Sequence, residues 1–214
     1  MSEARKLYKA LGNIAYGFIF ILIHINIGAV DILPDFVGFI MITVAVISLK
    51  DECKTIKLLK PLGIFLSAWE AVTLILNFTA TNTLQLAVYY LSSVVSIIEI
   101  YFYFQLFTDI SLIAKKYQSE NEALDKKLIT RRNIYAVTQT VIYVITNLIT
   151  YSSLLNDIFD IDENLSLYIV APVAVINLIV LFMIVSALFS VRKLFSCNGI
   201  SQYTEATENE NGLS

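Results

Sequence analysis

Six long apolar stretches limit what this chain can fold into more than any other feature of its sequence. They cover residues 11–30, 32–49, 62–78, 84–107, 134–155 and 165–190. A helix needs about 20 mostly apolar residues to cross the hydrocarbon core of a bilayer, whereas each strand of a membrane barrel is a segment of about 10 residues with alternating polarity. The stretches here are continuous, so we expect an all-α fold: a polytopic membrane bundle of six transmembrane helices.

The composition agrees with a membrane protein and excludes several other classes. Of the 214 residues, 57% are hydrophobic and 15% are charged, whereas about 25% of the residues of a soluble domain are charged. Two Cys residues are too few for a disulfide scaffold, and seven Gly with three Pro exclude a collagen-like chain. A cleaved signal peptide is the alternative for the first stretch, but its apolar run is longer than the roughly 7–15 residues typical of such peptides.

The Lys and Arg residues occur only in alternate connections between the apolar stretches. They lie before the first stretch, between the second and third, between the fourth and fifth, and after the sixth: Arg5, Lys6, Lys9, Lys50, Lys54, Lys57, Lys60, Lys115, Lys116, Lys126, Lys127, Arg131, Arg132, Arg192 and Lys193. Short cytoplasmic loops retain Lys and Arg when a membrane protein is inserted. We therefore predict a plasma-membrane protein with both termini in the cytoplasm and its spans arranged as three hairpins.

The predicted cytoplasmic parts are a connector and a tail. We expect one membrane domain over residues 1–197 and a polar, disordered tail over 198–214. The connector at 109–133 carries six basic residues, so it is expected to extend the fourth helix or to lie along lipid headgroups; the alternative is a helix that docks a protein partner. Cys53 and Cys197 fall on the cytoplasmic side, where thiols stay reduced. The acidic connection at 156–164 is interpreted as a solvated loop; the alternative is a site for a cation such as calcium.

Two carboxyl residues, Glu70 and Glu99, lie inside the third and fourth apolar stretches, each eight residues from the predicted cytoplasmic end. A charged side chain near the bilayer centre costs at least about 2.5–3.5 kcal/mol. Both are expected about 12 Å from the cytoplasmic interface on adjacent helices. If they face each other, the pair would retain a proton and could relay protons or bind a cation. The alternative is that two protonated side chains hydrogen-bond across the helices and only support packing.

Other polar residues complete the candidate intramembrane site: His24 and Asn26 in the first stretch, Asn77 in the third, and Gln139 and Asn147 in the fifth. A polar stripe on a membrane helix must face other helices or a water-filled cavity. The alternative for each residue is a hydrogen bond that only supports packing. Because one His cannot assemble the usual metal triad and no HExxH motif is present, we predict no metal, no cofactor and no catalytic residue.

A tight turn is predicted where the first two stretches meet, in the string VDILPDFVGFI at residues 30–40. Asp31 is interpreted as the N-cap of the second helix, Pro34 as an early helical residue, and Asp35 as an acid that complements the helix dipole; the alternative is ligand binding. The string resembles the D-I-L-P-D-F-[IV]-G segment of a group of uncharacterised small multi-pass bacterial membrane proteins. That resemblance implies a bacterial plasma-membrane protein and no particular activity.

These residues favour two functional hypotheses over a third. The first is a small transporter or permease-like protein with Glu70, Glu99, His24 and the polar fifth stretch near its pathway. The second is a non-transporting accessory, immunity or sensor module that acts through protein partners and its basic connector. An enzyme is third, because no nucleophile–base pair or metal constellation is found. The expected partners are the lipid bilayer and a proton or cation, with no nucleic acid, and a protein partner is left open.

Overall fold

A computed structural model describes residues 3–22, 26–27, 30–31, 35–79, 82–119, 123–154 and 163–196 of the chain. Over these residues it contains six helices, which confirms the all-α class: α1 Glu3–Leu22, α2 Asp35–Ser48, α3 Ile56–Thr79, α4 Asn82–Tyr117, α5 Leu124–Leu154 and α6 Glu163–Lys193. Two short antiparallel strands, β1 Asn26–Ile27 and β2 Val30–Asp31, lie between α1 and α2. The predicted tail at 198–214 and the acidic connection as far as residue 162 lie outside the described residues.

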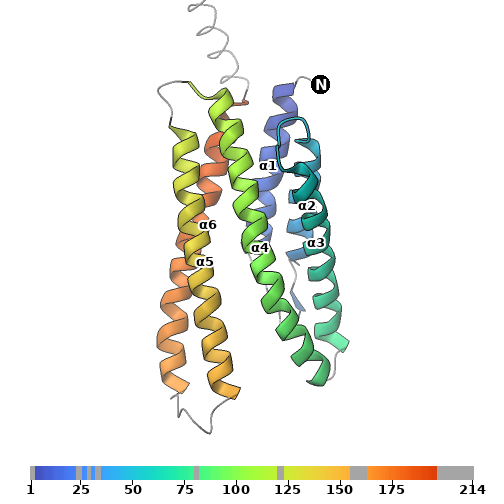
Figure 1. Ribbon diagram of the computed structural model, residues 1–214, viewed down its shortest axis with the longest axis vertical. Coiled ribbons are helices and arrows are strands. Elements are labelled where there is room, and N and C mark those ends of the chain that lie inside the picture. The colour runs from blue at the N-terminus through green and yellow to red at the C-terminus, as the bar shows by residue number, and fades with distance from the viewer. Residues whose placement is uncertain are drawn as a thin grey trace, which may run out of the picture.

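The helices lie side by side in one bundle and form a ring. Each helix packs against the next one in the chain, and α6 closes the ring against α1. Figure 1 shows the N-terminus at the upper end of the bundle, together with the α2–α3 and α4–α5 connections. The short connections therefore make consecutive helices antiparallel.

The predicted connector at 109–133 is mostly helical, because α4 continues to Tyr117 and α5 begins at Leu124. Two reciprocal hydrogen bonds close the turn between them. The Gln118 side chain donates to Asp125 Oδ1 at 2.7 Å and accepts from the Asp125 backbone N–H at 3.1 Å. The bond from Gln118 lowers the pKa of the Asp125 carboxyl. This turn leaves little chain between the two helices.

The structure corrects the first two predicted spans. α1 ends at Leu22 instead of continuing to residue 30, and Asp31 pairs with Asn26 in the strands instead of capping α2. α2 begins at Asp35, and its 14 residues rise only about 21 Å, less than the roughly 30 Å of a hydrocarbon core. Figure 1 shows both strands above the lower ends of α3 to α6. The α1–α2 hairpin therefore turns part-way along the bundle, because strand pairing takes up its backbone groups there.

Two glycines allow α1 and α2 to pack closely. A Cβ atom at Gly38 would lie 2.6 Å from the backbone oxygen of Gly17 and 2.5 Å from Ile21 Cγ1. A Cβ atom at Gly17 would lie 2.8 Å from the backbone oxygen of Gly38 and 2.7 Å from Ile42 Cγ1. Small residues at helix interfaces let the backbones approach each other. The glycine of the VDILPDFVGFI string thus holds the start of α2 against α1.

Among the described residues, three helices are long and apolar enough to cross a membrane, over Ile56–Leu76 in α3, Tyr90–Tyr117 in α4 and Ala171–Lys193 in α6. α2 is apolar but shorter. α5 has 31 residues, but polar side chains such as Gln139 and Asn147 interrupt its apolar sequence. α6 continues as one helix through Pro172.

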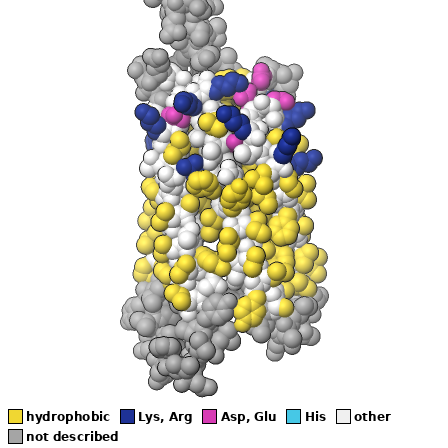
Figure 2. Space-filling view, viewed as in Figure 1, with side chains coloured by type: hydrophobic (Ala, Val, Ile, Leu, Met, Phe, Trp, Pro, Cys, Tyr) yellow, Lys and Arg dark blue, Asp and Glu magenta, His cyan; other side chains and the backbone are white. Residues whose placement is uncertain are grey.

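The Lys and Arg residues mark one end of the bundle. All fifteen Lys and Arg residues lie in or near the helix ends and connections at the upper end. Figure 2 shows their side chains gathered there, with hydrophobic side chains over the face below. Acidic residues pair with some of them: Lys116 Nζ lies 2.9 Å from Glu52 Oε1, and Lys6 Nζ lies 3.3 Å from Asp51 Oδ2. The described residues therefore form a charged end, marked by Lys and Arg, above an apolar face.

Below the charged end, the buried core contains a group of packed rings that we call the aromatic cluster. It comprises Phe18, Phe39, Phe102, Tyr103, Phe107 and Tyr135. These rings come from α1, α2, α4 and α5, and none is more than 4% exposed. Their centroids lie 4.7 to 6.5 Å apart, the range in which aromatic pairs attract each other. The cluster closes the interior between the charged end and the polar residues described next.

Candidate functional site

Two polar cavities lie beside the aromatic cluster. The lateral cavity, of about 250 Å³, lies between α4 and α5 and is lined by Ser92, Ser93, Ser96, Glu99, Ile100, Tyr135, Gln139, Ile142, Tyr143, Thr146 and Asn147. The central cavity, of about 320 Å³, is lined by Phe18, Ile21, Asp35, Glu99, Tyr103, Tyr135, Gln139, Ala174, Asn177, Leu178 and Leu181. Glu99, Tyr135 and Gln139 line both, so the two cavities adjoin at these three side chains.

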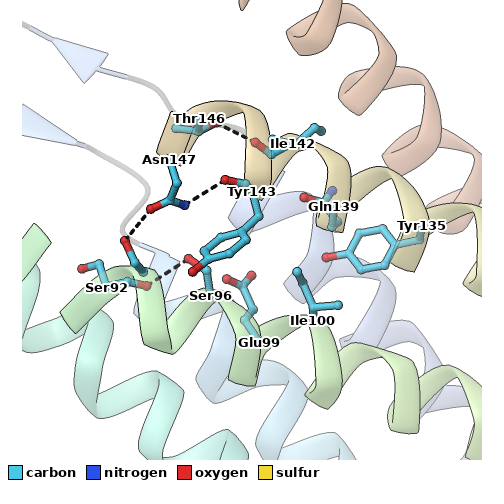
Figure 3. A pocket seen from close by; sticks show the side chains of 11 residues that line it. Ser92, Ser96, Glu99, Ile100, Tyr135, Gln139, Ile142, Tyr143, Thr146 and Asn147 are labelled. Carbon is cyan, nitrogen blue, oxygen red and sulfur yellow. Dashed lines mark hydrogen bonds between the residues drawn. The ribbon is translucent and has the colours of Figure 1, made fainter. Parts of the chain in front are cut away.

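Helical spacing brings the polar side chains of the lateral cavity together. Ser92, Ser96 and Glu99 are four and three residues apart on α4, and residues at this spacing share one helix face. Figure 3 shows the Glu99 carboxyl pointing from α4 toward α5, with Tyr143 and Tyr135 on the opposite wall. Glu99 lies half-way along α4, seventeen residues after Asn82 and eighteen before Tyr117.

An interhelical hydrogen bond joins the walls of the lateral cavity away from the charged end. The Ser93 hydroxyl donates to Asn147 Oδ1 at 3.2 Å, and Asn147 Nδ2 donates to the Tyr143 backbone oxygen at 2.8 Å (Figure 3). The hydroxyls of Ser96 and Thr146 donate to backbone oxygens of their own helices. The Asn147 amide thus joins α5 to α4 at this level.

The central cavity combines carboxyl, amide and phenol groups with an apolar wall. Asp35, the first residue of α2, and Glu99 of α4 supply the two carboxyls. Across the cavity, Gln139 Nε2 donates to Asn177 Oδ1 at 2.6 Å and so joins α5 to α6. Because the α1–α2 hairpin turns part-way along the bundle, the first turn of α2 lies at the level of Glu99. The hairpin is what brings Asp35 into this cavity.

Tyr103 forms the boundary between the central cavity and the aromatic cluster. Its ring lies 4.7 Å from that of Phe18 and 5.8 Å from that of Tyr135, measured between centroids. Its hydroxyl is buried next to the Glu99 carboxyl and has no hydrogen bond of ordinary length to a described residue. A buried hydroxyl without a partner costs about 1–3 kcal/mol. The Tyr103 hydroxyl is therefore a buried polar group at the border of the central cavity.

The surroundings of Glu99 are acidic. Its carboxyl experiences the charges of Glu70 and Asp35, and no Lys, Arg or His is among the described residues that line either cavity. Within the described part of the chain, no three or more His, Cys, Asp and Glu side chains form a group that could hold a metal ion. A carboxyl in such surroundings is suited to bind a proton or a positively charged ligand.

Some of the predicted site residues line the two cavities and others do not. Glu99, Gln139 and Asn147 line the cavities, whereas Glu70 lies on α3, lines neither cavity, and accepts a hydrogen bond from Thr73 to its backbone oxygen at 3.0 Å. The charge of Glu70 nevertheless reaches Glu99. His24 and Pro34 lie outside the described residues, as do the side chains of Asn26, Asp31 and Asn77.

Sequence reasoning missed four polar residues of the central cavity. It placed Asp35 at an outer turn, and it did not include Tyr103, Tyr135 or Asn177. Two of these carried a usable signal: Tyr103 follows Glu99 by four residues, and Tyr135 precedes Gln139 by four, so each extends a polar helix face by one turn. The positions of Asp35 and Asn177 depend on how the helices pack, which no local pattern specifies.

A separate polar network lies at the charged end and holds the α2–α3 connection against α4. Asp109, only 1% exposed, accepts hydrogen bonds from the Thr55 backbone N–H at 3.1 Å and from the Thr55 hydroxyl at 2.8 Å. Burial, and secondarily the charge of Asp109, raise the pKa of the Cys53 thiol to about 12. Glu52 accepts hydrogen bonds from Lys116 and from Tyr117, both at 2.9 Å. These contacts serve packing.

Comparison with known proteins gives no match to this chain among family models, curated proteins or solved structures.

Proposed function

We propose that the chain is an integral membrane protein that crosses the bacterial plasma membrane as three helical hairpins with both termini in the cytoplasm. The supporting observation is the separation of charge, because every Lys and Arg lies toward one end of the bundle. Cytoplasmic segments retain such residues. On this orientation the aromatic cluster lies between Glu99 and the cytoplasm, and the lateral cavity extends from Glu99 toward the outer side.

In this membrane protein, the function that the geometry supports best is that of a small transporter for a proton or cation. The observation that carries it is the position of Glu99, where two polar cavities adjoin inside an apolar bundle. Ionisable residues within membrane helices are costly and mark ion pathways or proton relays. Glu99 would hold the transported charge, and the Ser, Gln, Asn and Tyr side chains around it would replace its water.

The closed aromatic cluster favours a carrier over an open pore. Phe18, Tyr103 and Tyr135 are each at most 4% exposed and pack between Glu99 and the charged end, so a bound cation cannot continue inward without a rearrangement of these rings. A rearrangement that opens one side of a central site at a time is the basis of alternating access. We therefore expect slow, saturable transport instead of a steady conductance.

The rival accessory module receives less support from the connector. Arg131 donates to the backbone oxygen of Met183 on α6, and Arg132 donates to Thr108 on α4 at 2.8 Å. The guanidinium of Arg132 also lies 4.1 Å from the centroid of Phe104. These two charges are turned toward the bundle, so they stabilise helix packing instead of presenting a surface to a partner.

Flux measurements in proteoliposomes test the transporter. Wild-type protein should move protons or monovalent cations down an imposed gradient, and Glu99→Gln, which removes the charge with little change in shape, should lower the rate at least tenfold. Glu70→Gln should have a smaller effect, because Glu70 lies outside both cavities. Asp51→Asn is the matched control, since Asp51 is an exposed carboxyl at the charged end. Equal background leakage for wild type and Glu99→Gln under every gradient would overturn the proposal.

A further inference from the structure

We propose that the central cavity binds a small amphiphilic organic cation, a protonated amine or a quaternary ammonium, with its nitrogen between the carboxyls of Asp35 and Glu99. This inference rests on the proposed function, because it takes the same chamber as the binding site and names its ligand class. In the central cavity the two carboxyls face the same space as a wall that is about half apolar.

Charge selects a cation for this cavity. Asp35 and Glu99 come from different helices and line one space of about 320 Å³, and none of the described residues around it is basic. The Glu99 carboxyl experiences the charge of Asp35, so the two acids repel each other when both are ionised. A positive group between them relieves that repulsion, whereas an anion would increase it.

The apolar part of the cavity wall favours a ligand that carries a hydrophobic group. Phe18, Ile21, Ala174, Leu178 and Leu181 make up about half of the lining residues. A bare Ca²⁺ ion takes about six to eight oxygen ligands and nothing else, so it would leave this part of the wall without a contact. An alkyl or aryl group attached to the nitrogen fills it. Ligand sites commonly join an apolar wall with a few placed polar groups.

The aromatic and amide side chains of the cavity supply further contacts to the nitrogen of the ligand. The rings of Tyr103 and Tyr135 both line the cavity and meet at 87° with centroids 5.8 Å apart, and the faces of such rings attract ammonium groups in proteins. The Tyr103 hydroxyl, which lies next to the Glu99 carboxyl without a hydrogen bond of ordinary length to a described residue, can accept a hydrogen bond from an N–H of a protonated amine. Gln139 uses its Nε2 on Asn177, which leaves Oε1 to accept a second bond.

The test measures binding of benzylammonium to the full chain purified in detergent, by calorimetry and by the shift in thermal unfolding. Benzyl alcohol is the neutral ligand of the same shape, and methylammonium is the cation without the apolar body. We expect benzylammonium to bind at least tenfold more tightly than either. Glu99→Gln and Asp35→Asn should each weaken benzylammonium binding at least tenfold, and Ala174→Leu should weaken benzylammonium more than methylammonium. Ala171→Leu, on the same helix but outside the cavity lining, is the matched control and should bind as wild type does.

The outcomes separate this inference from the proposed function. If benzyl alcohol binds as tightly as benzylammonium, or if Ala174→Leu and Ala171→Leu behave alike, the inference is overturned. If Glu99-dependent cation flux occurs and no amine binds, the inference fails while the transporter proposal stands. If benzylammonium binds as described and no proton, alkali cation or amine crosses the liposome membrane, the transporter proposal fails and the binding site stands.

Discussion

Gly38 shows how one hydrogen in place of a methyl group can control a helix interface. Gly38→Ala should lower the free energy of unfolding by about 1–3 kcal/mol, as overpacked substitutions commonly do. The added Cβ would lie 2.6 Å from the Gly17 backbone oxygen and 2.5 Å from Ile21 Cγ1, and a backbone atom cannot move aside without separating α1 from α2. Thermal unfolding in detergent measures the loss.

Gly12→Ala is the control for this substitution, because it adds the same methyl group elsewhere on α1. A Cβ atom at Gly12 would lie 3.1 Å from Arg192 Nε, near the end of a flexible side chain. The guanidinium can shift by a few tenths of an ångström, so we expect a smaller loss than for Gly38→Ala. Equal stability of Gly38→Ala and wild type, or a larger loss for Gly12→Ala, would contradict this account of the interface.

Cys53 should be almost unreactive in the folded protein. Burial raises the pKa of its thiol from the ordinary 9.0 to about 12, and only the thiolate is nucleophilic. In a Cys197→Ser background, alkylation at pH 8 should be at least about a hundredfold slower in the folded state than after unfolding, since the thiolate fraction falls about tenfold for each unit of pKa. Quenched iodoacetamide labelling followed by mass spectrometry gives both rates.

The direction of the pKa shift of Cys53 also predicts a pH dependence. A group whose pKa is higher in the folded state favours folding fully below its unfolded pKa, so this contribution is present below about pH 9 and decreases as the pH rises toward 12. Cys53→Ala should remove the part of the decrease in unfolding free energy at alkaline pH that comes from ionisation of this thiol. Rapid alkylation of the folded protein at pH 8 would show that the thiol is not shielded as the structure indicates.

At the scale of helices, Arg132 connects α5 to α4. Arg132→Ala should lower the free energy of unfolding by about 1–2 kcal/mol, because it removes a cation–π contact with Phe104 and a hydrogen bond to Thr108. Arg132→Lys should recover only part of this, since an ammonium lacks the planar face that stacks on the ring. Lys127→Ala is the control, because Lys127 is an exposed residue near the start of the same helix. It should change the free energy of unfolding little. Equal losses of unfolding free energy for Arg132→Ala and Lys127→Ala would contradict this role of Arg132 in connecting α5 to α4.

The hydropathy pattern predicted where the helices lie better than it predicted where α1 ends. Hydropathy located all six helices, but it could not show that α1 ends at Leu22, because strand and helix residues are equally apolar there. A weak signal was present: Ile23, Ile25 and Ile27 alternate with polar His24 and Asn26, a period typical of a strand. Two residues separate Ile27 from Val30, the loop length of tight hairpins.

The candidate site was predictable only where one helix specifies it. Glu99, Gln139 and Asn147 were recognisable as polar residues in apolar helices, because their cost in lipid demands a protein environment. Asp35 was not, since its place beside Glu99 depends on the depth at which the α1–α2 hairpin turns. That depth is set by strand pairing and by the glycine contact between the two helices, which are tertiary features.

At the scale of the whole molecule, the separation of charge predicts which side of the membrane each end occupies. In a variant without native cysteines, Ala80→Cys in the α3–α4 connection should react with an impermeant maleimide added to intact cells, and Lys126→Cys near the start of α5 should react only after permeabilisation. The physical reason is that insertion retains Lys- and Arg-rich segments in the cytoplasm, and Lys126 belongs to such a segment whereas no basic residue adjoins Ala80. Detergent-solubilised samples, in which both sites should label, control for local burial. The reverse labelling pattern would turn the lateral cavity toward the cytoplasm and place the aromatic cluster on the outer side of Glu99, so a cation would then enter the chamber from inside the cell.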